Sequence, residues 1–254
     1  MIKFKDRDKF VAWFMGFCDA EANFQTTTIN RKNGTFGLKY SFHLGLQLLD
    51  KALVEYIHEN LENKGHVYNY EIKKESHLAI TKKDDLKWLL NNIFNTYPLL
   101  TKHQATRLLK LKLGIENNIK NIQSLSESPY TISYVVTDFK DCSSIFLDYW
   151  IVGFLNGEVS FSFRQKDVNK FIPIVNLEHT DERVVKMIKD RLNLNPEVTV
   201  RLRENRKPIY SLYLSSRKDL KYLVEFLDEN KSLKGYKLYQ YESWKAKFHD
   251  FFKK

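Results

Sequence analysis

Two glutamates occupy equivalent positions in a segment that occurs twice in this chain. Residues 16–24 read GFCDAEANF and residues 153–161 read GFLNGEVSF, so Glu21 and Glu158 stand at the same place in the two copies. Apolar residues at helical spacing precede each acid. Two carboxylates at the negative ends of two helix dipoles would repel each other and would favour a bound divalent cation. The repeated pair therefore indicates metal-dependent carboxylate chemistry if the two helices meet.

The duplication separates this interpretation from a purely structural one. A helical stripe of Trp, Phe and Gly is usually core, and an acid at a helix end is usually solvated, so either copy alone would favour a structural role. Two further segments also repeat in the same order, because 85–89 resembles 219–223 and 46–50 resembles 177–181. Three ordered matches predict an internal duplication, which is a pseudo-dimer within one chain.

Each half is expected to run helix, two strands, helix, two strands and helices. The first helical pattern ends at Glu21, and a turn at Asn33-Gly34 separates the first two strands. From Phe36 to Leu46 the even-numbered residues are apolar, which is typical of a strand with one buried face. The other elements expected in this half are a helix over 50–61, strands near 66–72 and 77–81, and helices from 84 and from about 102.

A segment of low periodicity separates the halves. Residues 117–143 include Ser124, Ser126, Ser128 and Pro129 and show little hydrophobic pattern. Such a composition is typical of a linker that crosses a protein surface. We therefore expect an N-terminal half over 1–117, a linker over 118–143 and a C-terminal half over 144–254.

The chain is strongly basic. Its 41 Lys and Arg residues and 31 Asp and Glu residues leave a formal net charge of +10. This charge suits a nucleic acid, although it would also suit a membrane surface or simple solubility. Cys18 and Cys142 are too few for a disulfide scaffold or a zinc module. No apolar run approaches the roughly 18 residues of a membrane span and no targeting signal is evident, so we expect an intracellular protein without a membrane partner.

The two repeated segments resemble the motifs of the LAGLIDADG homing endonuclease family. The similar stretches are residues 13–21, WFMGFCDAE, and residues 149–158, YWIVGFLNGE, and the resemblance covers nearly the whole chain. It implies an α+β fold of two pseudo-symmetric αββαββα halves, packed through paired motif helices, with antiparallel sheets that form a DNA-binding saddle. Gly16 and Gly153 lack a Cβ atom and would let the motif helices approach closely.

The resemblance also implies a metal centre. In relatives, the acid that ends each motif and the backbone carbonyl after it can join the metal shell, which here implies Glu21, Glu158, Ala22 and Val159. Oxygen ligands and a phosphodiester substrate favour magnesium, with other divalent cations as alternatives. The family usually has glycine after the acid, so Ala22 and Val159 depart from its pattern.

Further catalytic positions follow from the resemblance. The family places a lysine before the last helix of each half, which implies Lys102 and Lys237, with Lys234 as an alternative in the second half. Many relatives also have a polar residue, often Gln, at the start of the second helix. The matching residues here are Asp50 and Asp181, which are equally typical of helix N-caps.

DNA recognition is expected from polar faces of the strands, because a two-stranded ribbon can enter the major groove. Alternation assigns one set of residues in each half to such a face. Residues 199–203, TVRLR, are unusually basic for a plain solvent face. The candidates are Gln25, Thr27, Lys39, Ser41 and His43 in the first half, and Ser160, Ser162, Arg164, Thr199, Arg201 and Arg203 in the second.

The sequence therefore predicts a monomeric, site-specific endonuclease that hydrolyses both strands of a long DNA target. One alternative is an intron-encoded maturase, which would bind its own group I intron RNA with little or no nuclease activity, and the departures at Ala22 and Val159 keep this alternative open. A basic DNA-binding regulator without nuclease activity is a third hypothesis. A mitochondrial location is expected if the gene lies in an organellar intron.

Overall fold

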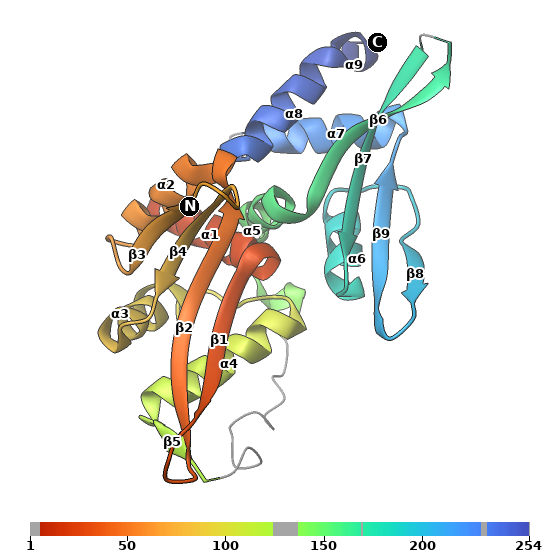
Figure 1. The fold of residues 1–254 in the computed structure, drawn as a ribbon. Helices are drawn as coiled ribbons and strands as arrows, with labels where there is room; N and C mark the ends of the chain where they lie inside the picture. Colours follow the sequence, from red (N-terminus) through yellow and green to blue (C-terminus); the bar gives the residue numbers. More distant parts are fainter. Residues whose placement is uncertain (1–5, 124–136, 169, 230–232, 254) are drawn as a thin grey trace.

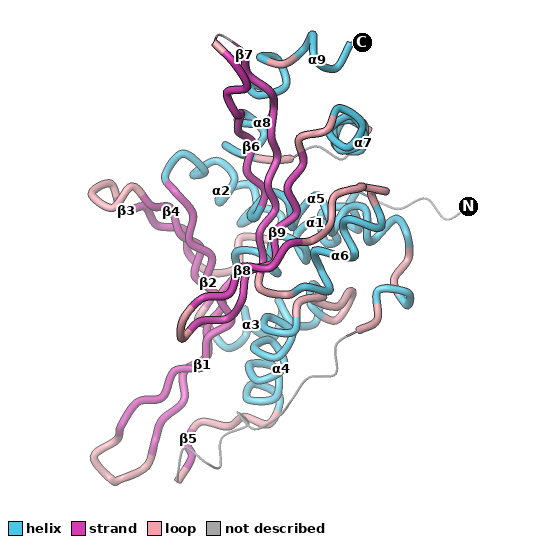
Figure 2. Tube along the Cα trace, turned by 90° about the vertical axis from the view of Figure 1, so that its right-hand side faces the viewer, coloured by secondary structure: helices cyan, strands magenta, loops and turns pink. Residues whose placement is uncertain are grey.

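A computed structural model describes residues 6–123, 137–168, 170–229 and 233–253. It contains two antiparallel sheets, each with its own helices, and two central helices join the halves (Figure 1). Seen from the side, most helices lie on one side of the molecule and the strands on the other (Figure 2). The predicted α+β fold with two repeated halves is confirmed.

The first half contains a sheet of strand order β1-β2-β4-β3. In β2 the even-numbered residues Leu38, Phe42 and Leu44 are buried, so the predicted alternation holds. The elements of this half are α1 (Asp6–Glu21), β1 (Ala22–Asn30), β2 (Phe36–Gln47), η1 (Leu48–Asp50), α2 (Lys51–Asn60), β3 (His66–Tyr70), β4 (Glu75–Ile80), α3 (Lys83–Leu89), η2 (Leu90–Phe94) and α4 (Lys102–Glu116).

The second half repeats this order, with strands arranged β6-β7-β9-β8. In this half the last long helix is followed by a short additional helix. The elements are η5 (Phe139–Asp141), α5 (Ser144–Glu158), β6 (Val159–Asp167), β7 (Lys170–His179), α6 (Glu182–Arg191), β8 (Thr199–Arg203), β9 (Arg206–Leu214), α7 (Arg217–Asp228), α8 (Gly235–Lys247) and α9 (His249–Lys253).

Part of the predicted linker belongs to the first sheet. Strand β5 (Asn121–Ile122) pairs with β2 at Phe36 and Gly37. The Ser- and Pro-containing stretch with Ser124, Ser126, Ser128 and Pro129 lies outside the described residues. Within the part of the chain that is described, no helix has both the length and the apolar character needed to cross a membrane.

The two motif helices approach each other through their glycines. A Cβ atom added to Gly16 would lie 1.9 Å from the Trp150 carbonyl oxygen, and one added to Gly153 would lie 1.8 Å from the Trp13 carbonyl oxygen. No side chain fits at either position, because these atoms belong to the backbone of the facing helix. The expected close approach through glycine is confirmed.

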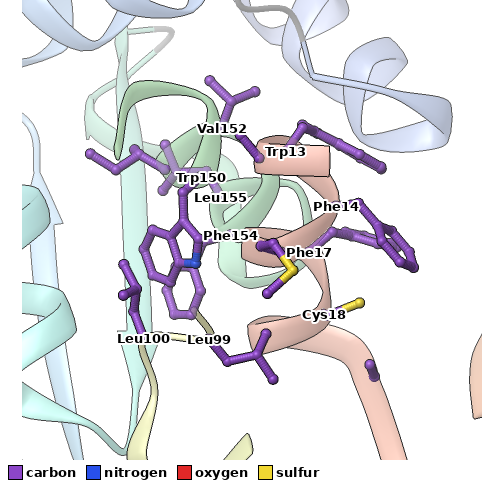
Figure 3. Packing of buried hydrophobic residues seen from close by; sticks show 14 of the residues in the cluster. Trp13, Phe14, Phe17, Cys18, Leu99, Leu100, Trp150, Val152, Phe154 and Leu155 are labelled. Carbon is purple, nitrogen blue, oxygen red and sulfur yellow. The ribbon is translucent and has the colours of Figure 1, made fainter. Parts of the chain in front are cut away.

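Aromatic side chains surround this contact (Figure 3). Trp13 stacks on Phe17 with ring centroids 5.0 Å apart, and Trp150 stacks on Phe154 at 4.9 Å. All four side chains are at most 2% exposed. Burial of each such side chain contributes roughly 1.5–3 kcal/mol, so the helix pair forms part of the core and holds the ends of both helices in place.

Candidate active site

Glu21 and Glu158 end the two central helices, and β1 and β6 begin at the next residues. Both acids are partly buried. Burial raises the pKa of Glu158 to about 7, and the charge of Glu21 contributes to this rise while Lys237 opposes it. The Glu21 side chain lies against the last turn of α5, since a Cβ atom on Gly157 would be 2.9 Å from Glu21 Oε1. The structure therefore brings the two predicted acids together.

The backbone carbonyl after each acid accepts a hydrogen bond from the last long helix of its own half. Gln104 Nε2 donates to the Ala22 carbonyl at 2.6 Å, and Lys237 Nζ donates to the Val159 carbonyl at 2.7 Å. Burial lowers the pKa of Lys237, and the charges of Glu21 and other nearby acids oppose this shift. Lys237 Nζ therefore contacts the Val159 carbonyl and lies close enough to both acids to interact with their charges.

The matching of Lys102 with Lys237 is wrong. Helix α4 starts at Lys102 after the N-cap Thr101, whereas α8 starts at Gly235 after Lys234. Lys102 is therefore equivalent to Gly235, and Gln104 is equivalent to Lys237. The first half has an amide where the second has an ammonium group. A register difference of two residues cannot be seen in a lysine-rich sequence without the helix starts.

Lys234 contacts aromatic rings instead of the acids. Its Nζ lies 5.5 Å from the ring centroid of Trp13 and 5.0 Å from that of Tyr56. Burial lowers the pKa of this lysine. Its backbone N–H donates to Asn156 Oδ1, which ties the start of α8 to the motif helix α5. We therefore assign Lys234 to the packing between the halves.

Asp50 and Asp181 precede α2 and α6, but neither side chain caps its own helix. Asp50 Oδ1 instead accepts a hydrogen bond of 2.7 Å from the Tyr236 N–H, and Asp181 Oδ2 accepts one of 3.1 Å from the Lys102 N–H. Each aspartate thus satisfies a free N–H in the first turn of the last long helix of the opposite half. The contact at Tyr236 fixes the turn that carries Lys237.

Two contributors to the site were missed. Asp19 accepts hydrogen bonds from Leu100 N, Thr101 N, Thr101 Oγ1 and Trp150 Nε1, so it joins α4 and α5 to α1. Gln104 carries no charge, so its place beside the acids could not be predicted from the sequence. The repeat does hold a signal for Asp19, since Asn156 occupies the equivalent position and bonds the equivalent backbone.

A groove of about 550 Å³ opens beside Glu21 in the first half. Glu21, Lys237 and Asp50 line it together with Gln47 and His77 from β2 and β4. The Gln47 amide donates to Asp50 Oδ2 at 3.3 Å. Two linked polar residues, Gln47 and Asp50, therefore precede the second helix of this half. The groove extends from Glu21 and Lys237 to the polar face of the first sheet.

Sequence comparison agrees with the division of the chain into two similar halves. A family model described as LAGLIDADG endonuclease matches residues 14–113 and 151–248, which covers both halves. The chain belongs to the LAGLIDADG endonuclease family. A yeast (Saccharomyces cerevisiae) relative, "Uncharacterized mitochondrial protein RF1", is 25% identical over 170 residues, covering 63% of this chain and 34% of the relative. The chain therefore spans about a third of the length of that relative.

Solved structures of LAGLIDADG proteins share the fold. The meganuclease I-CpaMI, bound to uncleaved DNA, has a TM-score of 0.75 and 18% identity over 94% of this chain and 92% of its own. The homing endonuclease I-LtrWI, bound to target DNA, has a TM-score of 0.70 and 19% identity over 96% and 91% of the two chains. At such identities the likeness concerns the fold alone.

The polar residues assigned to the first sheet of this LAGLIDADG protein share one face. Gln25 pairs with Ser41 and Thr27 with Lys39, and the Ser41 hydroxyl donates to Gln25 Oε1 at 3.3 Å. His43 lies on the same face. There it contacts the Tyr68 hydroxyl at 3.0 Å and the His77 ring nitrogen at 3.2 Å.

The second sheet presents its polar residues in the same way over most of its length. Ser160, Ser162 and Arg164 alternate along β6, and Thr199 pairs with Ser211 of β9. Arg201 forms an ion pair of 3.2 Å with Glu178 and remains 63% exposed at its side chain.

The far end of β8 is less regular. The pairing of β8 with β9 shifts register between Arg201 and Arg203. The Arg203 guanidinium donates from Nε and Nη2 to the Lys207 carbonyl, so this side chain folds back onto its own hairpin. The alternate residues Val200 and Leu202 are 56% and 81% exposed, so the opposite face of this strand is not core.

Proposed function

We propose that this LAGLIDADG protein is a site-specific, magnesium-dependent endonuclease that cuts both strands of duplex DNA at the centre between its halves. The observation that carries the proposal is the meeting of Glu21 and Glu158 beside Lys237 at the ends of two helices packed backbone to backbone. Buried like charges in such a cleft are typical of functional sites.

The residues at this centre fit a hard divalent cation. The Glu21 and Glu158 carboxylates and the Ala22 and Val159 carbonyls supply oxygen atoms, which are the ligands that such a cation prefers. Among the described residues no group of three or more His, Cys, Asp or Glu side chains could hold a metal, so waters would complete the shell. A bound ion would supply activation of water and stabilisation of charge on the phosphate.

The protein's own groups would orient and stabilise the reacting phosphate. The Lys237 ammonium can stabilise negative charge that develops on phosphorus oxygens. Asp50 positions that lysine through the first turn of α8. The glycine contact between the two motif helices holds their ends, and with them the two acids, close together.

Binding of duplex DNA is proposed for the polar faces of the two sheets. Gln25, Thr27, Lys39, Ser41 and His43 share one such face, and Arg201 extends from the second sheet. The net charge of +10 supports a polyanionic partner. Because both halves lie in one chain, we propose that it acts as a monomer. The name of the yeast relative supports a mitochondrial setting.

A selection from random DNA tests this proposal. A supercoiled plasmid pool with a long randomised insert is incubated with the protein in magnesium or in chelator, and cut ends are sequenced on both strands. Magnesium-dependent enrichment of one target supports the endonuclease. Absence of any enriched cut contradicts it, and binding of group I intron RNA would then support the maturase alternative, which the departures at Ala22 and Val159 leave open.

A further inference from the structure

The last long helices of the two halves carry a cation and an amide in opposite order. Helix α4 has Gln104 followed by Arg107, whereas α8 has Lys237 followed by Gln240. Residues three apart lie on the same face of a helix, so the members of each pair are neighbours. The equivalence of Gln104 and Lys237 follows from their contacts, since each donates to the carbonyl after an acid.

The cation of the first half is held away from its acid. Arg107 Nε donates to the Phe24 carbonyl at 3.1 Å, and its guanidinium also contacts Asn23 Oδ1. Phe24 is two residues farther along β1 than Ala22, a displacement of roughly 7 Å. Arg107 therefore does not take the place that Lys237 has in the second half.

The Gln104 amide and the Lys237 ammonium group also differ in how well they can stabilise a phosphate. Burial raises the pKa of both Glu21 and Glu158, and the Lys237 charge lowers both. Gln104 is 7% exposed, and its Oε1 atom has no hydrogen-bond partner among the described residues. This oxygen can accept a hydrogen bond from water, but the neutral amide carries no positive charge to offset the charge of a phosphate.

The geometry points to unequal cutting of the two strands. The strand whose scissile phosphate lies at the half containing Lys237 is cut first, and the strand at the half containing Gln104 is cut more slowly, so that nicked DNA accumulates. This inference rests on the proposed endonuclease function. In each cut a water oxygen bonds to phosphorus as one P–O ester bond breaks, and a proton from the water ends on the released hydroxyl group. Among the described residues, the group bonded to the carbonyl after the acid is an ammonium in the second half and a neutral amide in the first.

Loss of one preorganised charge-stabilising donor lowers a catalytic rate on the order of 100-fold. We therefore expect the second cut to be slower than the first by a factor of this order. The substitution Gln104→Lys should speed the slow strand, and the double substitution Gln104→Lys with Arg107→Gln copies the arrangement of α8. Lys237→Gln should slow the fast strand and bring the two rates together, while its amide can still donate to Val159.

The experiment uses the full chain, magnesium and the randomised supercoiled plasmid pool, with ends of nicked and linear products sequenced by strand over time. Wild-type nicks should fall on one strand of the enriched site, and the nicked form should diminish in the double variant. Lys112→Gln, a charge removal farther along α4 where Lys112 pairs with Glu116, is the matched control and should retain the wild-type bias.

The wild-type time course alone is decisive if a variant fails to fold. Equal nicking of both strands by the wild-type protein overturns the inference and leaves the endonuclease intact. A strand bias that persists unchanged in folded Lys237→Gln also overturns it, because the bias would then have another origin. Absence of any magnesium-dependent cut would instead contradict the endonuclease itself.

Discussion

The Trp150 indole on α5 donates a hydrogen bond of 2.9 Å from Nε1 to Oδ2 of Asp19 on α1. Trp13, the equivalent residue on α1, has no partner for its Nε1 among the described residues. The reason is that Asn156 replaces Asp19 in the second motif, and its Oδ1 accepts from the Lys234 N–H instead. The backbone contact between the helices is symmetric, whereas the polar contacts around it are not.

Asp19 should make stability fall with rising pH. Burial raises the pKa of its carboxyl to about 7, although four hydrogen bonds from Leu100, Thr101 and Trp150 oppose the shift. Because this value exceeds that of the unfolded chain, the folded state binds the proton more tightly, and the free energy of unfolding declines between about pH 4 and pH 7. The contribution is on the order of 4 kcal/mol.

Urea unfolding at pH 5 and pH 8 measures this effect in the wild-type protein and in Asp19→Asn. The variant should be less stable at pH 5, since its amide nitrogen cannot accept hydrogen bonds, but its stability should change less between the two pH values. Parallel losses in both proteins would show that other groups cause the pH dependence.

Gly16→Ala and Gly153→Ala should each destabilise the fold by about 3 kcal/mol or more, because the added methyl group meets the backbone of the facing helix. Gly37→Ala is a matched control, since its Cβ atom would meet only the end of the flexible Arg31 side chain. Chemical unfolding midpoints of the three variants provide the measurement. Similar losses at all three positions would argue against the helix contact as the cause.

Glu21→Gln and Glu158→Gln should each lower DNA cleavage by about 100-fold or more while folding and DNA binding persist. Removal of one of two repelling charges should leave affinity for the phosphate backbone unchanged or higher. Glu116→Gln removes an exposed acid on α4 and serves as the control. A Glu21→Gln, Glu158→Gln double variant that cuts both strands at the wild-type rate would exclude these acids as the catalytic pair.

Asp50→Ala should slow cleavage through the position of Lys237, and it should cost about 1 kcal/mol of stability because the Tyr236 N–H loses its acceptor. Asp50→Asn keeps an acceptor oxygen and should restore most of both properties. Cleavage rate and unfolding midpoint are measured together on the two variants. Full activity in folded Asp50→Ala would remove this aspartate from the positioning of the lysine.

Arg201→Ala should weaken DNA binding and reduce the slope of log K against log salt by about 0.9 if this side chain contacts a phosphate. Its ion pair with Glu178 is solvent-exposed, so the change in stability should stay below about 1 kcal/mol. Arg191→Ala removes an equal charge on α6, where Arg191 pairs with Asp148, and should leave the slope unchanged. Equal slopes for all three proteins would place Arg201 outside the interface.

The sequence by itself determined the features that local pattern encodes. The repeated motif identified Glu21 and Glu158, and the two-residue period of β2 assigned Ser41 and His43 to one face, because side-chain direction in a strand follows from position alone. Helical spacing likewise located the motif helices, and glycine marked where two backbones could meet. Each of these inferences needs only residues that are close in the chain.

Only the tertiary structure decided which groups surround the acids. The equivalence of Gln104 with Lys237 depends on where α4 and α8 begin, and a two-residue shift leaves the local pattern almost unchanged. The contacts from Asp50 to Tyr236 and from Asp19 to Trp150 join opposite halves. Such pairings arise from packing between distant segments, which satisfies buried polar groups wherever the fold brings them together, and no local periodicity records them.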